Sequence, residues 1–146
     1  MDMFENFASV LRKFGESINL QPLMLDDQNA CEVCLDGKQN VQIRFNRERL
    51  EVEFLTELGD INENYLERSC NCFLKANCDW ELTHGMTLSK RPDALKMLLG
   101  YHVPALNMDM PLFENIFKAF IREFEIWQQH LIHLYRGELP EVLSEL

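Results

Sequence analysis

Apolar residues recur along the chain with two different periods, and the period changes in a fixed order. Between residues 3 and 18 they return every three or four positions, which is the spacing of one face of a helix. Three later runs, CEVCLD (31–36), VQIRFN (41–46) and RLEVEFL (49–55), alternate apolar and polar side chains, as strands with one buried face do. The pattern therefore predicts a helix followed by a three-stranded antiparallel meander.

A second helix and a hairpin follow in the pattern. Residues 60–63 match a capping box, so we expect a helix of about four turns to open at Asp60. The next segment predicts a strand over Trp80–Leu88, a turn at residues 90–93 and a second strand. That second strand starts in the run Leu95–Leu99, which is too short for its period alone to distinguish strand from helix.

The last strong pattern is a long helix rich in aromatic residues. Asp109 predicts its N-cap, Pro111 suits its first turn, and Gly137 predicts its end. We expect its main aromatic stripe to be core that packs on the sheet; the stripe consists of Phe113, Phe117, Phe120, Phe124 and Trp127.

Length and charge restrict the class of protein. With 146 residues, of which 47% are apolar, the chain can form one domain with a buried core. We place this domain at residues 1–136 and an acidic tail at residues 137–146. The formal charge of -10 disfavours nucleic acid as a partner, because phosphate binding depends on cationic surfaces. The same charge attracts basic or amphipathic partner segments.

The sequence predicts neither export nor membrane insertion. The amino-terminal stretch MDMFENFASVLRKF lacks the basic region and the apolar run of a signal peptide. No later run approaches the roughly 20 apolar residues of a membrane span. Five cysteines without a signal peptide favour reduced thiols over a disulfide framework. We therefore expect a cytoplasmic protein.

Cysteine chemistry supplies an alternative function. Cys31 and Cys34 have the spacing of a thiol or zinc pair, but they lie in a predicted strand, where an odd spacing directs two side chains to opposite faces. The other three cysteines do not form a second such pair, and a zinc site would need four convergent ligands, drawn from Cys70, Cys72, Cys78 and His84. We expect inert thiols and no metal or cofactor, and a cysteine-based zinc or thiol protein stays open as the alternative.

Catalytic motifs are missing from the sequence. There is no nucleophile elbow around a serine and no glycine-rich phosphate loop among the six glycines. His130 and His133 lie three residues apart near the end of the last helix, where the helix dipole favours a cation, so we interpret them as structural. We expect a binding protein rather than an enzyme.

Two apolar surfaces have more than one interpretation. The apolar set of the first helix spans a broader arc than one packed face requires, so core packing and partner binding are both open for it. The second helix and the strand predicted after it form another apolar group, which is either core or a subunit interface.

This order of segments resembles the class I type III secretion chaperones of Gram-negative bacteria, the SycE/CesT-like family. Three stretches carry the resemblance, which covers about residues 2 to 135: FENFASVLRKFGESINL, ACEVCLDGKQNVQIRFNRERLEVEFLTEL, and MTLSKRPDALKMLLGYHVPALNMDMPLFENIFKAFIREFEIWQQHL. The resemblance implies an α+β fold with the order α-β-β-β-α-β-β-α, in which helices pack on an antiparallel twisted sheet.

The resemblance also implies a function. Chaperones of this kind form dimers, with themselves or with a related chaperone, and bind the amino-terminal segment of a secreted protein without ATP. The bound segment is extended and adds backbone to a sheet edge. Mapped here, the client-binding residues are Phe4, Phe7, Val10, Leu11 and Phe14, and the dimer contacts are Leu66, Phe73, Trp80, Leu82 and Met86. An adaptor that binds a folded protein is a further alternative.

Overall fold

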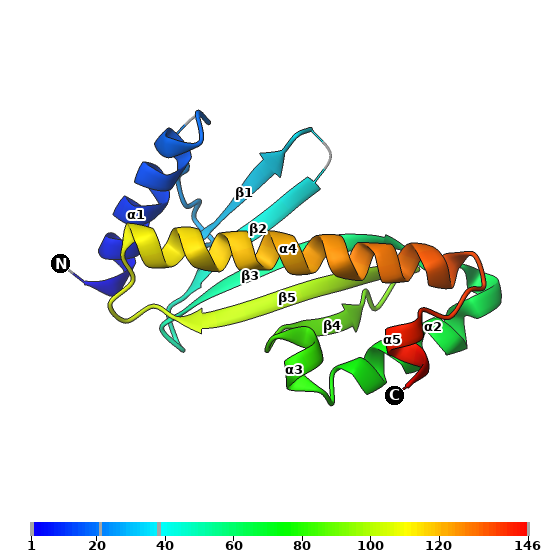
Figure 1. Ribbon diagram of the computed structural model, residues 1–146. Coiled ribbons are helices and arrows are strands. Elements are labelled where there is room, and N and C mark those ends of the chain that lie inside the picture. Colours follow the sequence, from blue (N-terminus) through cyan, green and yellow to red (C-terminus); the bar gives the residue numbers. More distant parts are fainter. Residues whose placement is uncertain (1, 21, 38, 146) are drawn as a thin grey trace. The chain divides into compact units, whose positions relative to one another are not determined.

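The computed structural model describes residues 2–20, 22–37 and 39–145 (Figure 1). It confirms the predicted order of helices and strands and adds three short helical segments, η1, α3 and α5. The elements are α1 (Met3–Ser17), β1 (Ala30–Leu35), β2 (Gln39–Asn46), β3 (Glu51–Asp60), η1 (Glu63–Tyr65), α2 (Leu66–Ala76), α3 (Trp80–Thr83), β4 (Thr87–Lys90), β5 (Lys96–Pro104), α4 (Met110–Tyr135) and α5 (Glu141–Ser144).

The chain divides by its internal contacts into two compact units. Unit 1 comprises Met1–Leu55 and His102–Phe120, and unit 2 comprises Thr56–Tyr101 and Ile121–Leu146. The strands form one five-stranded sheet in the order β1-β2-β3-β5-β4, so β1 and β4 are its two edge strands. β1 pairs with β2, and β4 with β5, in antiparallel register.

Unit 1 buries its apolar residues between one face of its strands and two helices. α1 begins at Asp2, whose side chain accepts a hydrogen bond from the Glu5 amide at 2.7 Å, as an N-cap does. Phe113 of α4 lies against the rings of Phe7, Phe14 and Phe54 at centroid distances of 5.8, 5.0 and 5.8 Å. Tilted and edge-on pairs of this kind add to the hydrophobic gain from burial.

The second helix starts later than the sequence predicts. The expected start at Asp60 is wrong, because Asp60 is the last residue of β3 and its carboxylate contacts the Lys96 ammonium. Asn62 caps instead, with its side chain accepting from the Asn64 amide at 3.0 Å, and the chain makes the single turn η1 before α2. α2 therefore has 11 residues, about three turns.

The predicted strand over Trp80–Leu88 is also wrong in its first part. The side chain of Asp79 accepts hydrogen bonds from the amides of Glu81 and Leu82, at 3.1 and 3.2 Å, and opens the helical turn α3. His84 and Gly85 follow with φ of 53° and 80°, which ends the turn, so β4 begins only at Thr87. The ambiguous run 95–99 is mostly strand, because β5 starts at Lys96.

The long helix α4 begins and ends near the predicted residues. The Leu112 amide donates to Asp109 Oδ1 at 2.9 Å, which confirms the N-cap. Gly137 has φ of 80°, and a Cβ there would lie 2.6 Å from the Tyr65 hydroxyl, so this position requires glycine. Its five predicted core aromatics are all buried, as expected; they are Phe113, Phe117, Phe120, Phe124 and Trp127.

The acidic tail belongs to unit 2 and is partly packed. Its helix α5 buries the side chain of Leu143, whereas Leu139 and Val142 are exposed. In the ranges 2–20, 22–37 and 39–145, no helix has both the length and the apolar character that crossing a membrane requires.

Replacing Phe113 with alanine tests the core of unit 1. We expect F113A to lower the free energy of unfolding by about 3–5 kcal/mol, because it removes a fully buried ring and leaves a cavity. Urea unfolding followed by circular dichroism measures the change. Leu112, the preceding residue of α4, is exposed, so L112A is the matched control and should change stability by less than about 1 kcal/mol. Equal losses in the two variants would contradict this placement of the core.

Candidate protein-binding site

Of the five predicted client-binding residues, only Phe4 reaches the surface of unit 1. The other four lie on the buried face of α1; they are Phe7, Val10, Leu11 and Phe14. Phe4 is half-buried. The broad apolar arc of α1 is therefore mostly core, and a partner can contact it directly only near its amino-terminal end.

Phe4 lines a hollow of about 450 Å³ in unit 1, the Phe4 hollow; its walls are Asp2, Met3, Phe4, Phe45, Arg47 and Leu50. The Arg47 guanidinium lies 3.9 Å from the centre of the Phe4 ring, a cation–π contact. Leu50 is exposed and has φ of 55°, unusual for a branched side chain. The hollow thus offers an apolar floor with one cation at its rim.

A second hollow of unit 1 runs along the edge strand β1. This edge hollow has a volume of about 500 Å³ and is lined by the connector after α1 and by β1; its residues are Leu20, Pro22, Leu23, Met24, Asp26, Ala30, Cys31, Glu32, Val33 and Cys34. Met24, one of these lining residues, is 75% exposed, although methionine side chains are more often buried. The apolar walls and the exposed methionine are features of a protein-binding surface.

The backbone of β1 is open toward this hollow. The Phe45 amide donates to the Asn29 carbonyl at 2.9 Å, which fixes the alternation of the β1–β2 ladder. By that alternation, the amides and carbonyls of Ala30, Glu32 and Cys34 point away from β2. Asp26 occupies those of Ala30, through contacts of 3.0 and 2.8 Å. Those of Glu32 and Cys34 have no hydrogen-bond partner among the described residues, so an added strand can pair with them.

The other edge of the sheet, in unit 2, is closed at its centre. The side-chain amide of Asn77 donates to the Leu88 carbonyl at 2.7 Å and accepts from the Leu88 amide at 2.9 Å. Asn77 thereby takes the place that a neighbouring strand would have beside β4. Strand addition is thus favoured at β1 over β4.

Burial makes the thiol of Cys31 a weak nucleophile. Burial, and after it the negative charges of Asp26 and Glu32, raise the pKa of Cys31 to about 11. Cys34 lies on the opposite face of β1 and is exposed, as the odd spacing predicts. The two sulfurs therefore do not form a redox pair of the usual kind, in which one thiol has a lowered pKa.

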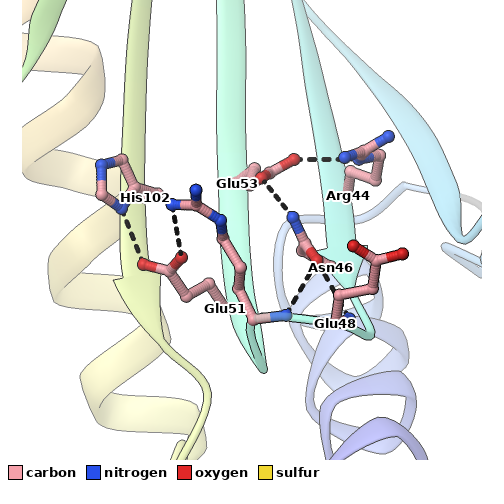
Figure 2. Close-up of polar contacts among 7 residues, drawn as sticks. Arg44, Asn46, Glu48, Glu51, Glu53 and His102 are labelled. Carbon is pink, nitrogen blue, oxygen red and sulfur yellow. Dashed lines mark hydrogen bonds and ion pairs between the residues drawn. The ribbon is translucent and has the colours of Figure 1, made fainter.

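Polar side chains cover the other face of the strands of unit 1 (Figure 2). Arg44 Nε lies 2.9 Å from Glu53 Oε1, and Asn46 donates to Glu53 Oε2 at 3.0 Å. His102 Nδ1 lies 2.7 Å from Glu51 Oε2. Burial acts to raise the pKa of Glu53, but the hydrogen bonds from Asn46 and Arg44 outweigh it, and the net pKa is lowered. Glu51 and Glu53 of β3 thus each have a polar partner on this face.

The predicted dimer residues separate into two groups in unit 2. Phe73 and Met86 are buried within the unit. Leu66 and Leu82 are half-buried, and Trp80 is 79% exposed. Their assignment to a dimer interface stays a prediction. Because Phe73 and Met86 are buried, they could only hold the exposed residues in place and not contact a partner themselves.

Sequence reasoning did not single out Leu74 of α2, which is 64% exposed. Its helical spacing from buried Phe73 and Ala76 could have indicated an outward position. With Trp80, it gives the α2–α3 segment two large exposed apolar side chains.

The alternative zinc site has no geometric support in the part of the chain that the structure describes. No three histidine, cysteine or acidic side chains converge there as metal ligands. Of the cysteines on and after α2, Cys72 is buried, Cys70 is half-buried and Cys78 is exposed.

Unit 2 contains one buried carboxylate that the sequence did not reveal. Glu123 accepts from the Trp127 indole N–H at 3.1 Å and lies 2.5 Å from His84 Nδ1. Two partners compensate the cost of burying this acid. Because His84 is distant in the sequence, no local pattern could have indicated the pair.

The two histidines at the end of α4 differ from each other. His133 Nδ1 lies 3.0 Å from Glu138 Oε2. His130 packs edge-on to Trp127 at 5.0 Å, and burial, followed by the charge of His133, lowers its pKa. Each ring thus contacts another side chain of unit 2, and the interpretation of both histidines as structural stays a prediction.

The model of the Tir chaperone protein (CesT) family matches residues 9–128. No curated protein sequence matches the chain.

Several solved structures share the fold. A chain of the ExsC–ExsE complex aligns with a TM-score of 0.78 and 20% identity, covering 90% of this chain and 97% of that chain. A chain of the HopA1–SchA chaperone–effector complex gives 0.71 and 16%, covering 88% and 98%. The Yersinia pestis type III secretion chaperone SycH, solved with a fragment of YscM2, gives 0.62 and 13%, covering 82% and 98%. These likenesses confirm the predicted fold class.

The reactivity of the two thiols on β1 tests the geometry of the edge hollow. We expect iodoacetamide at pH 8 to modify Cys34 readily and Cys31 at least about 100-fold more slowly, because a thiol with a pKa of about 11 is only about 0.1% thiolate at that pH. Mass spectrometry of peptides after timed quenching measures both rates. In urea the two rates should become similar, and a fast-reacting Cys31 in the folded chain would contradict the burial described here.

Proposed function

Because the chain belongs to the Tir chaperone protein (CesT) family, we propose that it is a type III secretion chaperone of the bacterial cytoplasm. It binds the amino-terminal segment of a secreted protein and keeps that segment soluble and ready for export, without catalysis or ATP. The observation that carries the proposal is the family match over residues 9–128, which extends from α1 into α4. The HopA1–SchA structure, which shares the fold, is a chaperone–effector complex, and this supports a protein client here.

The proposed client site is the edge of β1 with the edge hollow. An extended segment would pair its backbone with the outward groups of Glu32 and Cys34, as in β-augmentation. Alternate side chains would enter the edge hollow beside Met24 and Val33. Apolar area removed from water supplies most of the affinity, at about 25 cal/mol per Å² before the cost of ordering the segment is subtracted.

The Phe4 hollow is the second proposed contact for the client. Its apolar floor and the cation of Arg47 suit an apolar side chain with a polar or acidic neighbour. Phe7 supports this surface from the core, since it is buried and its ring stacks on Phe45, a wall of the hollow, at 6.0 Å. Client binding by α1 is thus direct at Phe4 and indirect at the other predicted positions.

A matched pair of substitutions at Cys34 tests the client site. We expect C34P to weaken binding about tenfold or more, because proline removes an outward N–H at an edge position that tolerates it in the free protein. C34S keeps the N–H and should bind like the parent chain. Co-expressed amino-terminal segments of secreted proteins from the same bacterium serve as clients, and co-purification with protection from protease is measured.

Urea unfolding of both Cys34 variants shows whether the fold is retained. Equal client binding by C34P and C34S would rule out backbone pairing at β1. Protection of a folded domain instead of an extended segment would favour the adaptor alternative.

We also infer that the chain forms a dimer, with itself or with a related chaperone, through the α2–α3 segment. Support comes from its exposed apolar residues Leu74 and Trp80, since large exposed side chains of this kind are typical of interfaces. Isolated chains would leave both in water. Leu66 and Leu82, which are half-buried, would complete the contact.

Native mass measurement of a double variant tests the dimer. We expect L74S with W80S to shift the chain from dimer to monomer with little change in unfolding midpoint, because both side chains are exposed within the chain. Met24 is equally exposed but lies in unit 1, so M24S is the control and should stay dimeric. A parent chain that is monomeric alone and with related chaperones would refute the dimer.

A further inference from the structure

We propose that the segment bound at the β1 edge is a strand in which apolar residues alternate with lysine or arginine. This inference rests on the proposed function and specifies the chemistry of its client. It is carried by the open backbone of β1, by the alternation of its two faces, and by carboxylates beside it that have no counter-charge among the described residues.

The two faces of β1 differ in exposure: Glu32 and Cys34 are exposed, whereas Val33 on the other face is buried. In an added strand, the residues opposite Glu32 and Cys34 lie on the same face of the sheet as these two exposed side chains. The residues between them lie on the face of Cys31 and Val33, toward the interior of unit 1 and the apolar walls of the edge hollow. An occupant therefore needs apolar side chains at every second position only.

Three carboxylates lie beside the β1 edge. Asp26, Glu32 and Asp36 lie before, within and directly after β1, and Asp26 and Glu32 also line the edge hollow. None of the three forms an ion pair with any residue in the described ranges. After burial, these two negative charges are the next causes of the raised pKa of the Cys31 thiol, which lies in the same hollow.

The cation on the neighbouring strand β2, Arg44, does not neutralise this edge. Arg44 lies on β2 directly opposite Ala30, and Ala30 is two positions before Glu32 along β1. Arg44 and Glu32 are therefore on the same face of the sheet. The Arg44 guanidinium is directed toward β3, where Nε lies 2.9 Å from Glu53 Oε1 (Figure 2). The other oxygen of that carboxylate accepts a hydrogen bond from Asn46. Residue Gln42, directly opposite Glu32, carries no charge. A cationic side chain on the incoming strand is thus the group that Glu32 lacks.

Three synthetic peptides test the proposal on the full chain. Each has roughly eight residues, with valine at alternate positions and lysine, serine or glutamate between them, and carries a fluorescein. Anisotropy titrations at about 50 and about 300 mM salt give the dissociation constants. We expect the lysine peptide to bind about three- to tenfold more tightly than the glutamate peptide at low salt, with the serine peptide between them and the differences smaller at high salt.

Charge reversal at Glu32 locates the effect. We expect E32K to reverse the order of the lysine and glutamate peptides and to leave the serine peptide nearly unchanged. E48K is the matched control, because Glu48 is exposed in the turn after β2 and its reversal changes the net charge equally. It should preserve the original order. Unfolding midpoints of both variants should match the parent chain.

The outcomes separate this inference from the proposed function. Equal binding of the three peptides, still lost in C34P, would overturn the charge preference and leave strand addition intact. Reversal of the order by E48K as well as E32K would also overturn it, since the preference would then come from net charge. Failure of all three peptides to bind would overturn both the open edge and the preference.

Discussion

Both units depend on the burial of one helix, α4, which supplies core residues to each. Phe113, Phe117 and Phe120 contribute to unit 1, and Trp127 and Leu131 to unit 2. Large buried side chains of this kind supply much of the free energy that opposes the chain entropy of a small domain. Because α4 supplies these core residues, the inner face of the strands is buried. The outward face and the edges of the sheet are then left for binding.

The two edges of the sheet meet the same constraint differently. A backbone amide or carbonyl at an edge needs a partner or water. β4 obtains its partner within unit 2, from the side chain of Asn77, whereas the outward groups of Glu32 and Cys34 on β1 remain open. Carboxylates beside β1 keep that open strand from pairing with arbitrary chains, because a charged edge must be matched by its occupant. Openness and selectivity thus come from the same short strand.

Regular elements were predictable because their signals are local, and the sites were not. The alternation in residues 31–55 indicated three strands, and Asp109 indicated the start of α4. Asp60 misled because two capping residues lie close together there: Asp60 is the last residue of β3, and Asn62 provides the cap. The turn at Asp79 had a local signal that the apolar side chain of Trp80 obscured. Which apolar residues of α1 reach the surface depends on tertiary packing, and the helical spacing of apolar residues in the sequence does not indicate it.

The closure of β4 by Asn77 limits how many neighbours the sheet can acquire. A sheet that offers pairing groups on both edges can be extended by one copy after another, and repeated addition of this kind produces fibres. Here a strand can join at β1, but the opposite edge is already satisfied at Leu88 by a side chain. A second copy of this chain that joined β1 to β1 would present its own closed β4 as the new edge, so extension by copies of the chain would stop there. A chain with this arrangement can hold an unfolded segment in extended form without becoming a template for polymer growth.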